Sequence, residues 1–390
     1  MHFDPLMLQL VGALLVMLAM ALVMRLLRQP SVVGYIVAGL LLGPSGFDFF
    51  HEYQLVVRMG DLGVMLLLFF VGMETSPRRL LQRWRVTLLG IVVQIAGSLL
   101  LMSLLAWWLG WPPARAVLMA FVISLSSTAV VLNYLRDTGQ MQSRLGRDAL
   151  GILIAQDVLL VPMLLVVNWI AGGRPHPGEL ALQGIGALLA LGLLAWMTLG
   201  GVVKLPWARR LRADRELQVF VAFGLCLGFA LLFAYFRLSS ALGAFLAGML
   251  IGVARETNWV HHRLEPFRTV FVALFFVSVG LLVSVPFVRE NWLLVGVVTL
   301  GVFLCNTGVN AVIFRMLGDG WRYSLFAGAH LAQVGEFSFV LAAAGARESM
   351  ISDVTYQLVV AVIALSLALS PGWIAAVGWV QRGKEQAPRG

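Results

Sequence analysis

The sequence has few charged residues and almost no cysteine, and both scarcities limit what the protein can be. Charged residues make up 12% of the chain, roughly half the share found in soluble domains. The two cysteines, Cys226 and Cys305, lie inside apolar runs, which argues against a disulfide framework or a zinc site. The net charge of +9 does not indicate nucleic-acid binding, because the basic residues form no aromatic-rich patch. We therefore expect no cofactor and no nucleic-acid partner.

Long apolar runs are abundant instead. Hydrophobic residues make up 60% of the chain, and runs of about 20 residues, long enough to cross a bilayer, recur along it. The first run, from Leu6 to Leu27, is too long for a signal peptide and lacks a basic start, so we expect a transmembrane helix there. About thirteen segments are predicted, at 6–26, 31–46, 61–75, 86–109, 114–135, 146–171, 180–203, 217–236, 239–254, 268–285, 291–315, 323–345 and 355–379.

The distribution of lysine and arginine predicts how these segments are oriented. If the N-terminus is outside and the segments alternate, the cytosolic loops hold 22 of the 28 basic residues and the outer loops hold six. Such a bias predicts a multi-pass protein of the cell inner (plasma) membrane, with its N-terminus outside and its C-terminus cytoplasmic. It also leaves no basic residue near the bilayer centre.

An internal repeat divides the chain. GYIVAGLLLG at 34–43 and GAFLAGMLIG at 243–252 share glycines and apolar letters at an offset of 209 residues, and Pro162 maps onto Pro371 at the same offset. Because seven segments separate equivalent helices, and seven is odd, the two halves face opposite ways. Inverted repeats are typical of alternating-access transporters, whose substrate site lies at the midplane between broken helices.

Two polar stretches mark the helices that we expect to be broken. ISLSSTAVV at 123–131 and AHLAQVGEFSFV at 329–340 are more polar than their surroundings and lie in the middle of apolar segments. Unwound backbone there would expose carbonyls and helix ends that bind ions without a fixed charge. We predict that Ser126, Ser127 and Thr128 contribute to a cation site. The alternative is ordinary helix packing by small residues.

A carboxylate lies in the middle of the sixth segment. Asp157, in LGILIAQDVLLVPML at 150–164, is about 11 residues from the start of the helix, near the bilayer centre. A charge there costs at least about 2.5 kcal/mol and usually marks an ion or proton pathway. A buried carboxylate can take up a proton at moderate pH, and a monovalent cation that competes for the same oxygens gives exchange. We predict this exchange at Asp157, with Gln156 offering a carbonyl; the alternative is a structural ion pair.

Three further residues, Glu336, Gln333 and Asn306, are candidates for supporting the cation site. Glu336 could ligate the cation or offset helix dipoles, and it could equally hold its segment in place. Gln333 lies in the same polar stretch, and His330, about one turn before it, has either a packing role or a pH-sensing one. Asn306 is the third supporting candidate.

Four motifs together carry a resemblance to a known family. RQPSVVGYIVAGLLLGPSGF at 28–47, SLSSTAVV at 124–131, LGILIAQD at 150–157 and AQVGEFSF at 332–339 resemble the monovalent cation:proton antiporter-2 family, and especially the membrane domain of Kef-type potassium/proton antiporters. The resemblance implies a thirteen-helix sodium/proton-antiporter-like fold, a homodimer and transport rather than enzymatic activity. It implies exchange of potassium, or alternatively sodium, for a proton.

The resemblance also implies a division of labour along the chain. The implied parts are a scaffold at 1–109 and 217–290 (its 86–109 portion belonging to the core), a transport core at 110–179 and 291–380, a linker helix and cytosolic loop at 180–216, and a cytosolic tail at 381–390.

The sequence departs from the family pattern at two places. Kef-type proteins often carry a cytosolic nucleotide-binding domain, and no strand–GxGxxG–helix unit follows the last segment here. Many relatives place a lysine where this chain has Asn306, so a basic partner for Asp157 is not expected there. With Gln156 and Asn306 both neutral, we predict electroneutral exchange. A cation channel and a sodium-coupled symporter of the same fold are the alternatives.

Overall fold

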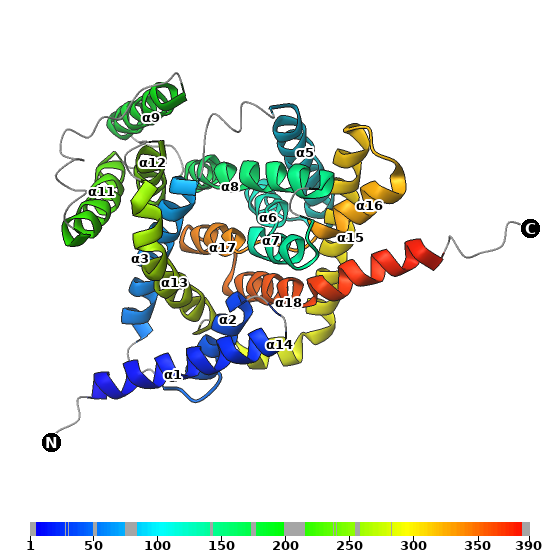
Figure 1. The fold of residues 1–390 in the computed structure, drawn as a ribbon, viewed down its shortest axis with the longest axis horizontal. Helices are drawn as coiled ribbons and strands as arrows, with labels where there is room; N and C mark the ends of the chain where they lie inside the picture. Colours follow the sequence, from blue (N-terminus) through cyan, green and yellow to red (C-terminus); the bar gives the residue numbers. More distant parts are fainter. Residues whose placement is uncertain are drawn as a thin grey trace, which may run out of the picture. The chain divides into compact units, whose positions relative to one another are not determined.

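The computed structural model describes most of the chain, and its regular structure there is helical (Figure 1). An isolated bridge between Ser126 and Val334 is the exception. The all-α fold predicted from the apolar runs is therefore confirmed. The described residues are 5–27, 29, 31–49, 53–74, 84–140, 143–172, 177–198, 215–236, 238, 240–253, 258–281 and 283–383. Residues 75–83 and 199–214, which hold most of the basic residues of two predicted cytosolic loops, lie outside them, as does the end of the predicted tail from 384.

The helices of the described residues follow one another along the chain. In chain order they are α1 (Pro5–Leu26), α2 (Ser31–Leu42), α3 (Tyr53–Glu74), α5 (Trp84–Leu109), α6 (Pro113–Ser124), α7 (Thr128–Asp137), α8 (Arg144–Ala171), α9 (Pro177–Thr198), α11 (Arg215–Tyr235), α12 (Ser240–Val253), α13 (Asn258–Leu281), α14 (Val285–Glu290), α15 (Trp292–Met316), α16 (Trp321–His330), α17 (Phe337–Arg347) and α18 (Asp353–Gly383).

Five helices of the described part are long and apolar enough to cross a membrane on their own: Leu89–Leu109, Arg144–Ala171, Glu216–Tyr235, Trp292–Met316 and Asp353–Trp379. Several other helices are apolar but shorter. Two consecutive pairs, α6 with α7 and α16 with α17, are each separated by a few residues without helical structure, as expected for broken helices. The number of thirteen crossings stays a prediction.

The order of the elements repeats as the sequence predicts. α5 begins at Trp84 and α15 begins at Trp292, 208 residues later. Each is followed by a broken pair and then by a long helix with a proline inside it, Pro162 in α8 and Pro371 in α18, which are 209 residues apart. Both prolines interrupt a helical hydrogen-bond ladder at corresponding places.

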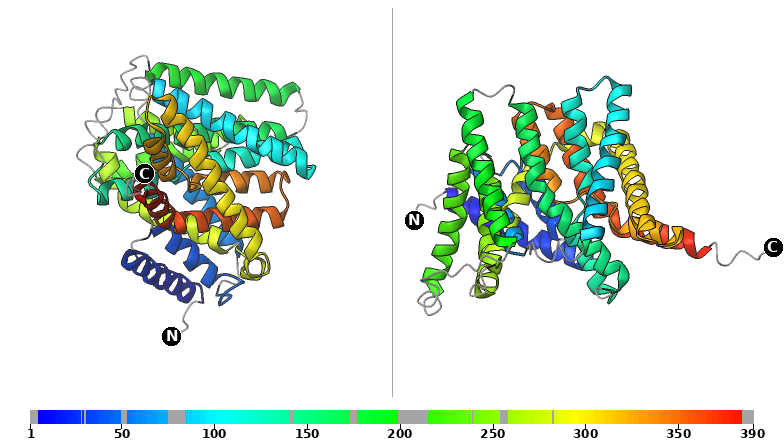
Figure 2. Two further views of the ribbon diagram at one scale, coloured as in Figure 1. Left: turned by 90° about the vertical axis from the view of Figure 1, so that its right-hand side faces the viewer. Right: turned by 90° about the horizontal axis from the view of Figure 1, so that it is seen from above.

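The chain forms two compact units by its internal contacts. The first comprises 1–51, 83–163 and 279–390 and holds both broken pairs; the second comprises 52–82 and 164–278. Figure 2 gives two further views in which the helices of each unit can be followed by colour. These contacts do not measure movement, so the predicted division into a scaffold and a transport core stays a prediction.

The first unit has a core that fastens the broken helices to α8 and α15. The buried side chains that share this cluster come from α7, α8, α15, α16 and the residue that follows α16. They are Val131, Leu135, Leu145, Ala149, Ile152, Leu153, Ile313, Phe314, Ala327 and Leu331. Burial of each large aliphatic side chain stabilises the fold by about 1.5–3 kcal/mol, so α7 and α16 are held despite their short length.

The second unit is built on a close approach of α3 and α12. A Cβ atom at Gly248 in α12 would clash with the carbonyl oxygen of Phe69 in α3, and one at Gly72 would clash with that of Phe245. Glycines on both helices thus let the two backbones touch, as small residues do where membrane helices pack.

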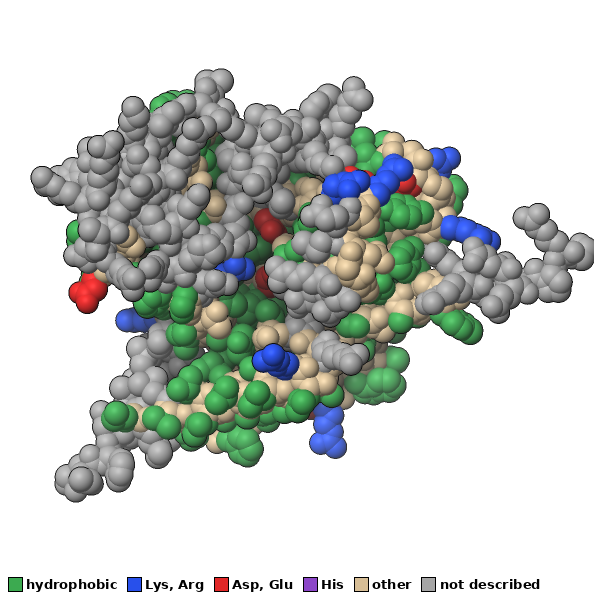
Figure 3. All heavy atoms as spheres, viewed as in Figure 1, with side chains coloured by type: hydrophobic (Ala, Val, Ile, Leu, Met, Phe, Trp, Pro, Cys, Tyr) green, Lys and Arg blue, Asp and Glu red, His purple; other side chains and the backbone are tan. Residues whose placement is uncertain are grey.

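Apolar side chains cover the outside of α1. Figure 3 shows them as a mostly green strip along this helix at the lower edge of the view. Leu14, Leu15, Leu18 and Leu22 are each more than half exposed. Such a surface suits contact with lipid, where an apolar residue loses nothing by exposure.

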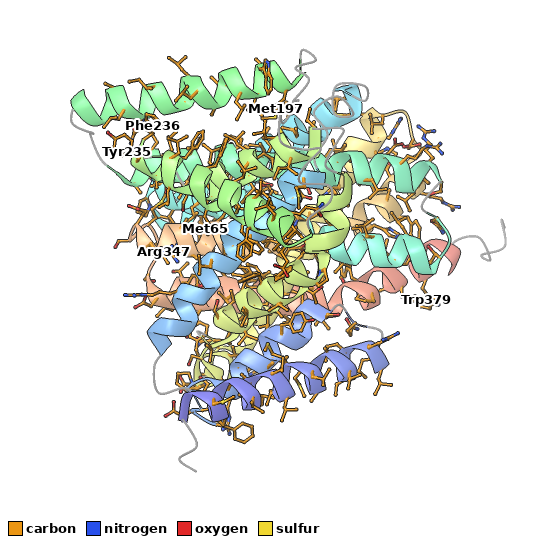
Figure 4. All side chains as sticks on the ribbon, turned by 60° about the vertical axis from the view of Figure 1, so that its left-hand side comes forward. Met65, Met197, Tyr235, Phe236, Arg347 and Trp379 are labelled. Atoms are coloured by element: carbon orange, nitrogen blue, oxygen red, sulfur yellow. The ribbon has the colours of Figure 1, made fainter. Side chains whose placement is uncertain are left out.

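Two labelled residues show where α17 and α18 of the first unit end. Figure 4 shows Arg347, the last residue of α17, on one side and Trp379, near the end of α18, on the other. Arg347 belongs to the predicted outer loops and Trp379 lies just before the predicted cytosolic tail. This arrangement is the one expected if α17 and α18 cross in opposite directions.

Candidate functional site

The first broken helix opens at three consecutive buried residues. α6 ends at Ser124, and α7 begins at Thr128. Leu125 has extended backbone angles, with φ of −92° and ψ of 122°. Serine hydroxyls compete with the helical ladder: that of Ser124 donates to the carbonyl of Phe121, and that of Ser127 accepts from the N–H of Val130 at the start of α7. The serine-rich letters thus end one helix and cap the next.

The second broken helix crosses the first one at this opening. The N–H of Gly335 donates to the carbonyl of Leu125 over 2.7 Å, beside the bridge of Ser126 with Val334. A Cβ atom at Gly335 would lie 2.6 Å from the carbonyl oxygen of Ser126, which is too close for any larger residue. Glycine is therefore required where the two unwound segments touch.

Two serine hydroxyls fasten the crossing further. Ser126 Oγ donates to the carbonyl of Leu331 over 2.8 Å, and Ser338 Oγ donates to the carbonyl of Val122 over 2.6 Å. Each bond joins one broken helix to the other and satisfies a carbonyl that unwinding leaves without its helical partner.

A single asparagine donates to both unwound ends. Nδ2 of Asn306, on α15 and 1% exposed, donates to the carbonyls of Ile123 (2.8 Å) and Ala332 (3.1 Å). One turn later, Asn310 Nδ2 donates to the carbonyl of Asn306. Helix ends of this kind carry partial negative charge, and here a neutral amide, rather than a cation, offers them hydrogens.

Asp157 lies beside the first break. Its carboxylate, on α8 and 9% exposed as a residue, accepts from the hydroxyl of Thr128, with Oγ1 3.1 Å from Oδ2 and 3.4 Å from Oδ1. Because Thr128 is the first residue of α7, the carboxylate lies at a helix N-terminus, where the dipole favours negative charge. The preceding Gln156 accepts from the N–H of Ser126 through Oε1 over 3.0 Å.

Glu336 occupies a similar position on the second broken helix. It directly precedes α17, and its Oε2 accepts from the hydroxyl of Ser127 over 2.8 Å. Gln333 is fully buried, and its Nε2 lies 3.5 Å from the carbonyl of Ser127. Consecutive hydroxyls, those of Ser127 and Thr128, thus contact two carboxylates that come from different elements.

The structure therefore brings the predicted site residues together. Asp157, Gln156, Ser126, Ser127, Thr128, Gln333, Glu336 and Asn306 all contact one of the two unwound segments or belong to it. Their roles in transport stay predictions. Sequence reasoning missed Ser338 and Asn310, although a polar residue inside an apolar helix was a signal that could have found them.

His330 has surroundings that fit packing. Its ring contacts those of Tyr134 and Phe326 edge-on, with centroids 4.4 and 4.6 Å away, and its Nδ1 lies 2.7 Å from the carbonyl of Phe326. The side chain thus packs between α16 and α7 at the crossing.

An ion pair at the beginning of α8 ties this helix to the loop that follows α15. Arg144 Nη2 lies 3.0 Å from Asp319 Oδ1, and Arg144 Nε lies 3.8 Å from Asp148 Oδ2. Burial raises the pKa of Asp319 above its ordinary value, while Arg144 lowers that pKa and Asp148 raises it. The pair joins the cytosolic ends predicted for the helices that carry Asp157 and Asn306.

The groups at the crossing that could hold a monovalent cation are oxygens. In the described part of the chain, no group of three or more His, Cys, Asp and Glu residues could hold a metal ion. Carboxylate, hydroxyl and carbonyl oxygens at unwound helices are the groups with which transporters and channels bind monovalent cations.

Known proteins share the sequence over most of its length. The family model described as "Sodium/hydrogen exchanger, transmembrane" matches residues 11–380. The iron transporter MagA of Paramagnetospirillum magneticum is 38% identical over 351 residues, which are 90% of this chain and 81% of that protein. The putative cation/proton antiporter YbaL of Escherichia coli is 33% identical over 380 residues, 95% of this chain and 68% of that protein.

More distant comparisons agree on the fold. The glutathione-regulated potassium-efflux protein KefC of Escherichia coli is 28% identical over 92% of this chain, which spans 58% of KefC. The structure of the sodium/proton antiporter MjNhaP1 of Methanocaldococcus jannaschii matches 97% of this chain and 98% of its own, with a TM-score of 0.65 at 14% identity. The predicted sodium/proton-antiporter-like fold is therefore confirmed.

Proposed function

Because the chain belongs to the sodium/hydrogen exchanger family, and within it to the monovalent cation:proton antiporter-2 group, we propose that it exchanges a monovalent cation for a proton at Asp157. The resemblance to Kef-type antiporters is thereby confirmed, and the family consists of transporters rather than enzymes. The observation that carries the proposal is the contact of Thr128 Oγ1 with the Asp157 carboxylate at the opening of a broken helix.

The chemistry of exchange is competition for one carboxylate. A proton and a dehydrated cation both need an Asp157 oxygen, so the site holds one or the other. The Thr128 hydroxyl and the carbonyls of the unwound segment can replace part of the hydration shell of the cation. If the helices at 110–179 and 291–380 move together, the loaded site opens alternately to each side of the membrane.

The charges at the site favour one-for-one exchange. The Asp157 carboxylate together with its bound proton or monovalent cation has no net charge. The neighbouring side chains of Gln156 and Thr128 do not titrate. Asn306 offers hydrogens to the helix ends without a titrating proton. The proposal requires Glu336 to keep one protonation state during the cycle. Its Oε2 accepts from the Ser127 hydroxyl, and it directly precedes α17, where the helix dipole favours negative charge.

Potassium is the favoured cation, with sodium as the alternative. KefC is by its name a potassium-efflux protein, whereas MjNhaP1 is described as a sodium/proton antiporter and MagA as an iron transporter. Oxygen ligands suit potassium and sodium alike. We further propose an inner-membrane homodimer with its N-terminus outside.

The experiment that tests the function is proton flux in proteoliposomes. Potassium, sodium, lithium, rubidium and ferrous ions are added in turn, and internal pH is followed with a dye, for the wild type and for Asp157→Asn. We expect potassium to drive proton movement in the wild type alone. Equal flux in the variant would remove Asp157 from the mechanism.

Two further measurements separate the alternatives. A voltage imposed at equal pH and equal cation on both sides should drive no sustained proton movement; such movement, absent from Asp157→Asn, would refute one-for-one exchange. Unitary currents would reveal a channel, and flux that depends on an organic solute would reveal a symporter.

A further inference from the structure

Four buried residues on α5, α8 and α15 carry polar atoms that take part in none of the contacts described so far. Gln94 on α5 is 1% exposed, and neither atom of its amide has a hydrogen-bond partner among the described residues. Ser98 Oγ, one turn later, Gln156 Nε2 on α8 and Asn310 Oδ1 on α15 are also buried without such a partner in the described structure. We call these four residues the α5 polar cluster. Native proteins rarely leave several buried polar atoms unpaired.

Helix packing places Gln94 level with Gln156. A Cβ atom at Gly90 would lie 3.0 Å from Cγ1 of Ile152, so α5 touches α8 at this level. Gln94 lies one turn after Gly90 on α5, and Gln156 lies one turn after Ile152 on α8. Because one crossing, α6 with α7, separates α5 from α8, the two helices run the same way, and the two amides come to the same height.

A second contact brings α15 to the same face of α5. A Cβ atom at Gly97 would lie 3.1 Å from both Cγ atoms of Val309, the residue before Asn310. Gly90, Gln94 and Gly97 recur at helical spacing and so share one side of α5. α8, which carries Gln156, and α15, which carries Asn310, therefore both pack against the side of α5 that carries Gln94.

We propose that the α5 polar cluster holds ordered water, and that this water fixes the Gln156 amide in the orientation that the crossing needs. The cluster offers five unpaired atoms: Gln94 Oε1 and Nε2, Ser98 Oγ, Gln156 Nε2 and Asn310 Oδ1. A buried water makes about three hydrogen bonds, so one or two waters satisfy this set.

The mixture of donors and acceptors selects water rather than a second cation. Two of the five atoms are amide nitrogens, whose hydrogens repel a cation, and the others accept or, for Ser98, do both. Water can turn a hydrogen toward an oxygen and a lone pair toward an N–H in the same site. A bare monovalent cation can satisfy only the oxygens.

The cluster acts on the site through Gln156. Oε1 of Gln156 must face the N–H of Ser126, because a backbone N–H can only donate a hydrogen bond. Nε2 of Gln156 must therefore point away from Ser126. Water between Gln156 and Gln94 gives Nε2 an acceptor and keeps the amide from turning over. Gln94 is thus a positioning residue for Ser126, and this role rests on the proposed exchange at Asp157, whereas the presence of water does not.

The test combines a structure and a transport assay on the full chain in lipid. A structure at a resolution that shows water should have density within hydrogen-bond reach of Gln94 and Gln156, and Gln94→Met should lose it. In proteoliposomes, Gln94→Met should raise the apparent KM for the cation about tenfold, with a smaller change in maximal rate. Gln94→Asn keeps an amide that a further water can reach, and it should restore most of the affinity.

Ser103→Ala, an exposed hydroxyl on the same helix, is the matched control and should leave both parameters unchanged. A dry cluster, or density coordinated as a cation, would overturn the proposal. If the wild type shows the water but Gln94→Met has an unchanged KM, the positioning role would be overturned. Ser98→Ala repeats the test if the methionine variant does not fold. Exchange that persists in Asp157→Asn would instead refute the proposed function, and it would leave the water density to be judged separately.

Discussion

The hydroxyl of Thr128 gives the sharpest test of the site, because it joins the Asp157 carboxylate to a broken helix. In Thr128→Val a methyl group replaces this hydroxyl at nearly the same volume. A hydrogen bond to a charged group contributes about 1.5–3 kcal/mol. The observed separations of 3.1 and 3.4 Å are longer than the ~2.6 Å of a strong bond of this type, so we expect about 1 kcal/mol.

This loss corresponds to an apparent KM for the cation that is about fivefold higher. The proton-loaded state should suffer less, since a protonated carboxyl can bond elsewhere in the crossing. The assay is cation-driven proton flux in proteoliposomes over a range of cation concentrations at fixed pH. Thr128→Ser keeps the hydroxyl and is the matched control, which should stay near the wild-type KM.

Folding must be separated from binding in this experiment. Thr128 is half-buried and begins α7, so both variants are compared by size-exclusion chromatography and melting temperature. A KM within twofold of the wild type in a folded Thr128→Val protein would refute the reasoning. The contact would then be a packing feature of the crossing.

Three further predictions concern the acid, the crossing and the loop ion pair. Asp157→Asn should abolish cation-dependent proton flux and leave a folded protein on size-exclusion chromatography; retained flux would contradict this. Gly335→Ala should lower the melting temperature, since the added methyl group would lie 2.6 Å from a backbone oxygen, whereas Gly308→Ala, with open space around it, should not. Burial raises the pKa of Asp319 above its ordinary 3.8 despite Arg144, so the folded protein binds more protons than the unfolded chain between the two values. The melting temperature should therefore fall as the pH rises through that window, and Asp319→Asn should flatten the fall; a flat wild-type curve would contradict this.

The long helices could be predicted closely from the sequence. The segment expected at 291–315 is α15, Trp292–Met316, and the one expected at 146–171 is α8, Arg144–Ala171. Both are marked by a long apolar run with polar or charged letters at each end, so burial and chain length decide their bounds. The breaks were also predictable, because serine and glycine clusters in an apolar run favour unwinding.

The pairing of the polar groups could not be predicted in the same way. Ser127 contacts Glu336, and Asn306 contacts carbonyls of two different segments. These pairs depend on how far each helix unwinds, and sequence spacing does not fix that. The repeat offset of 209 relates equivalent residues and does not name their partners: Ser126 bridges Val334, 208 residues later, whereas Ser127 bonds to Glu336, 209 residues later.

The contacts of the two broken helices explain how a neutral amide can replace a basic residue at Asn306. Each break brings one helix N-terminus and one helix C-terminus to the crossing. The N-terminal ends of α7 and α17 have carboxylates beside them, Asp157 through Thr128 and Glu336 by its place in the chain. The carbonyls at the C-terminal ends then require hydrogen-bond donors rather than a positive charge. Asn306 Nδ2 donates two hydrogen bonds to these carbonyls. A lysine there would add a positive charge and a proton that can leave. With asparagine, the helix ends are satisfied by a group whose charge does not change, which leaves the binding and release of the proton, in the proposed exchange, to Asp157.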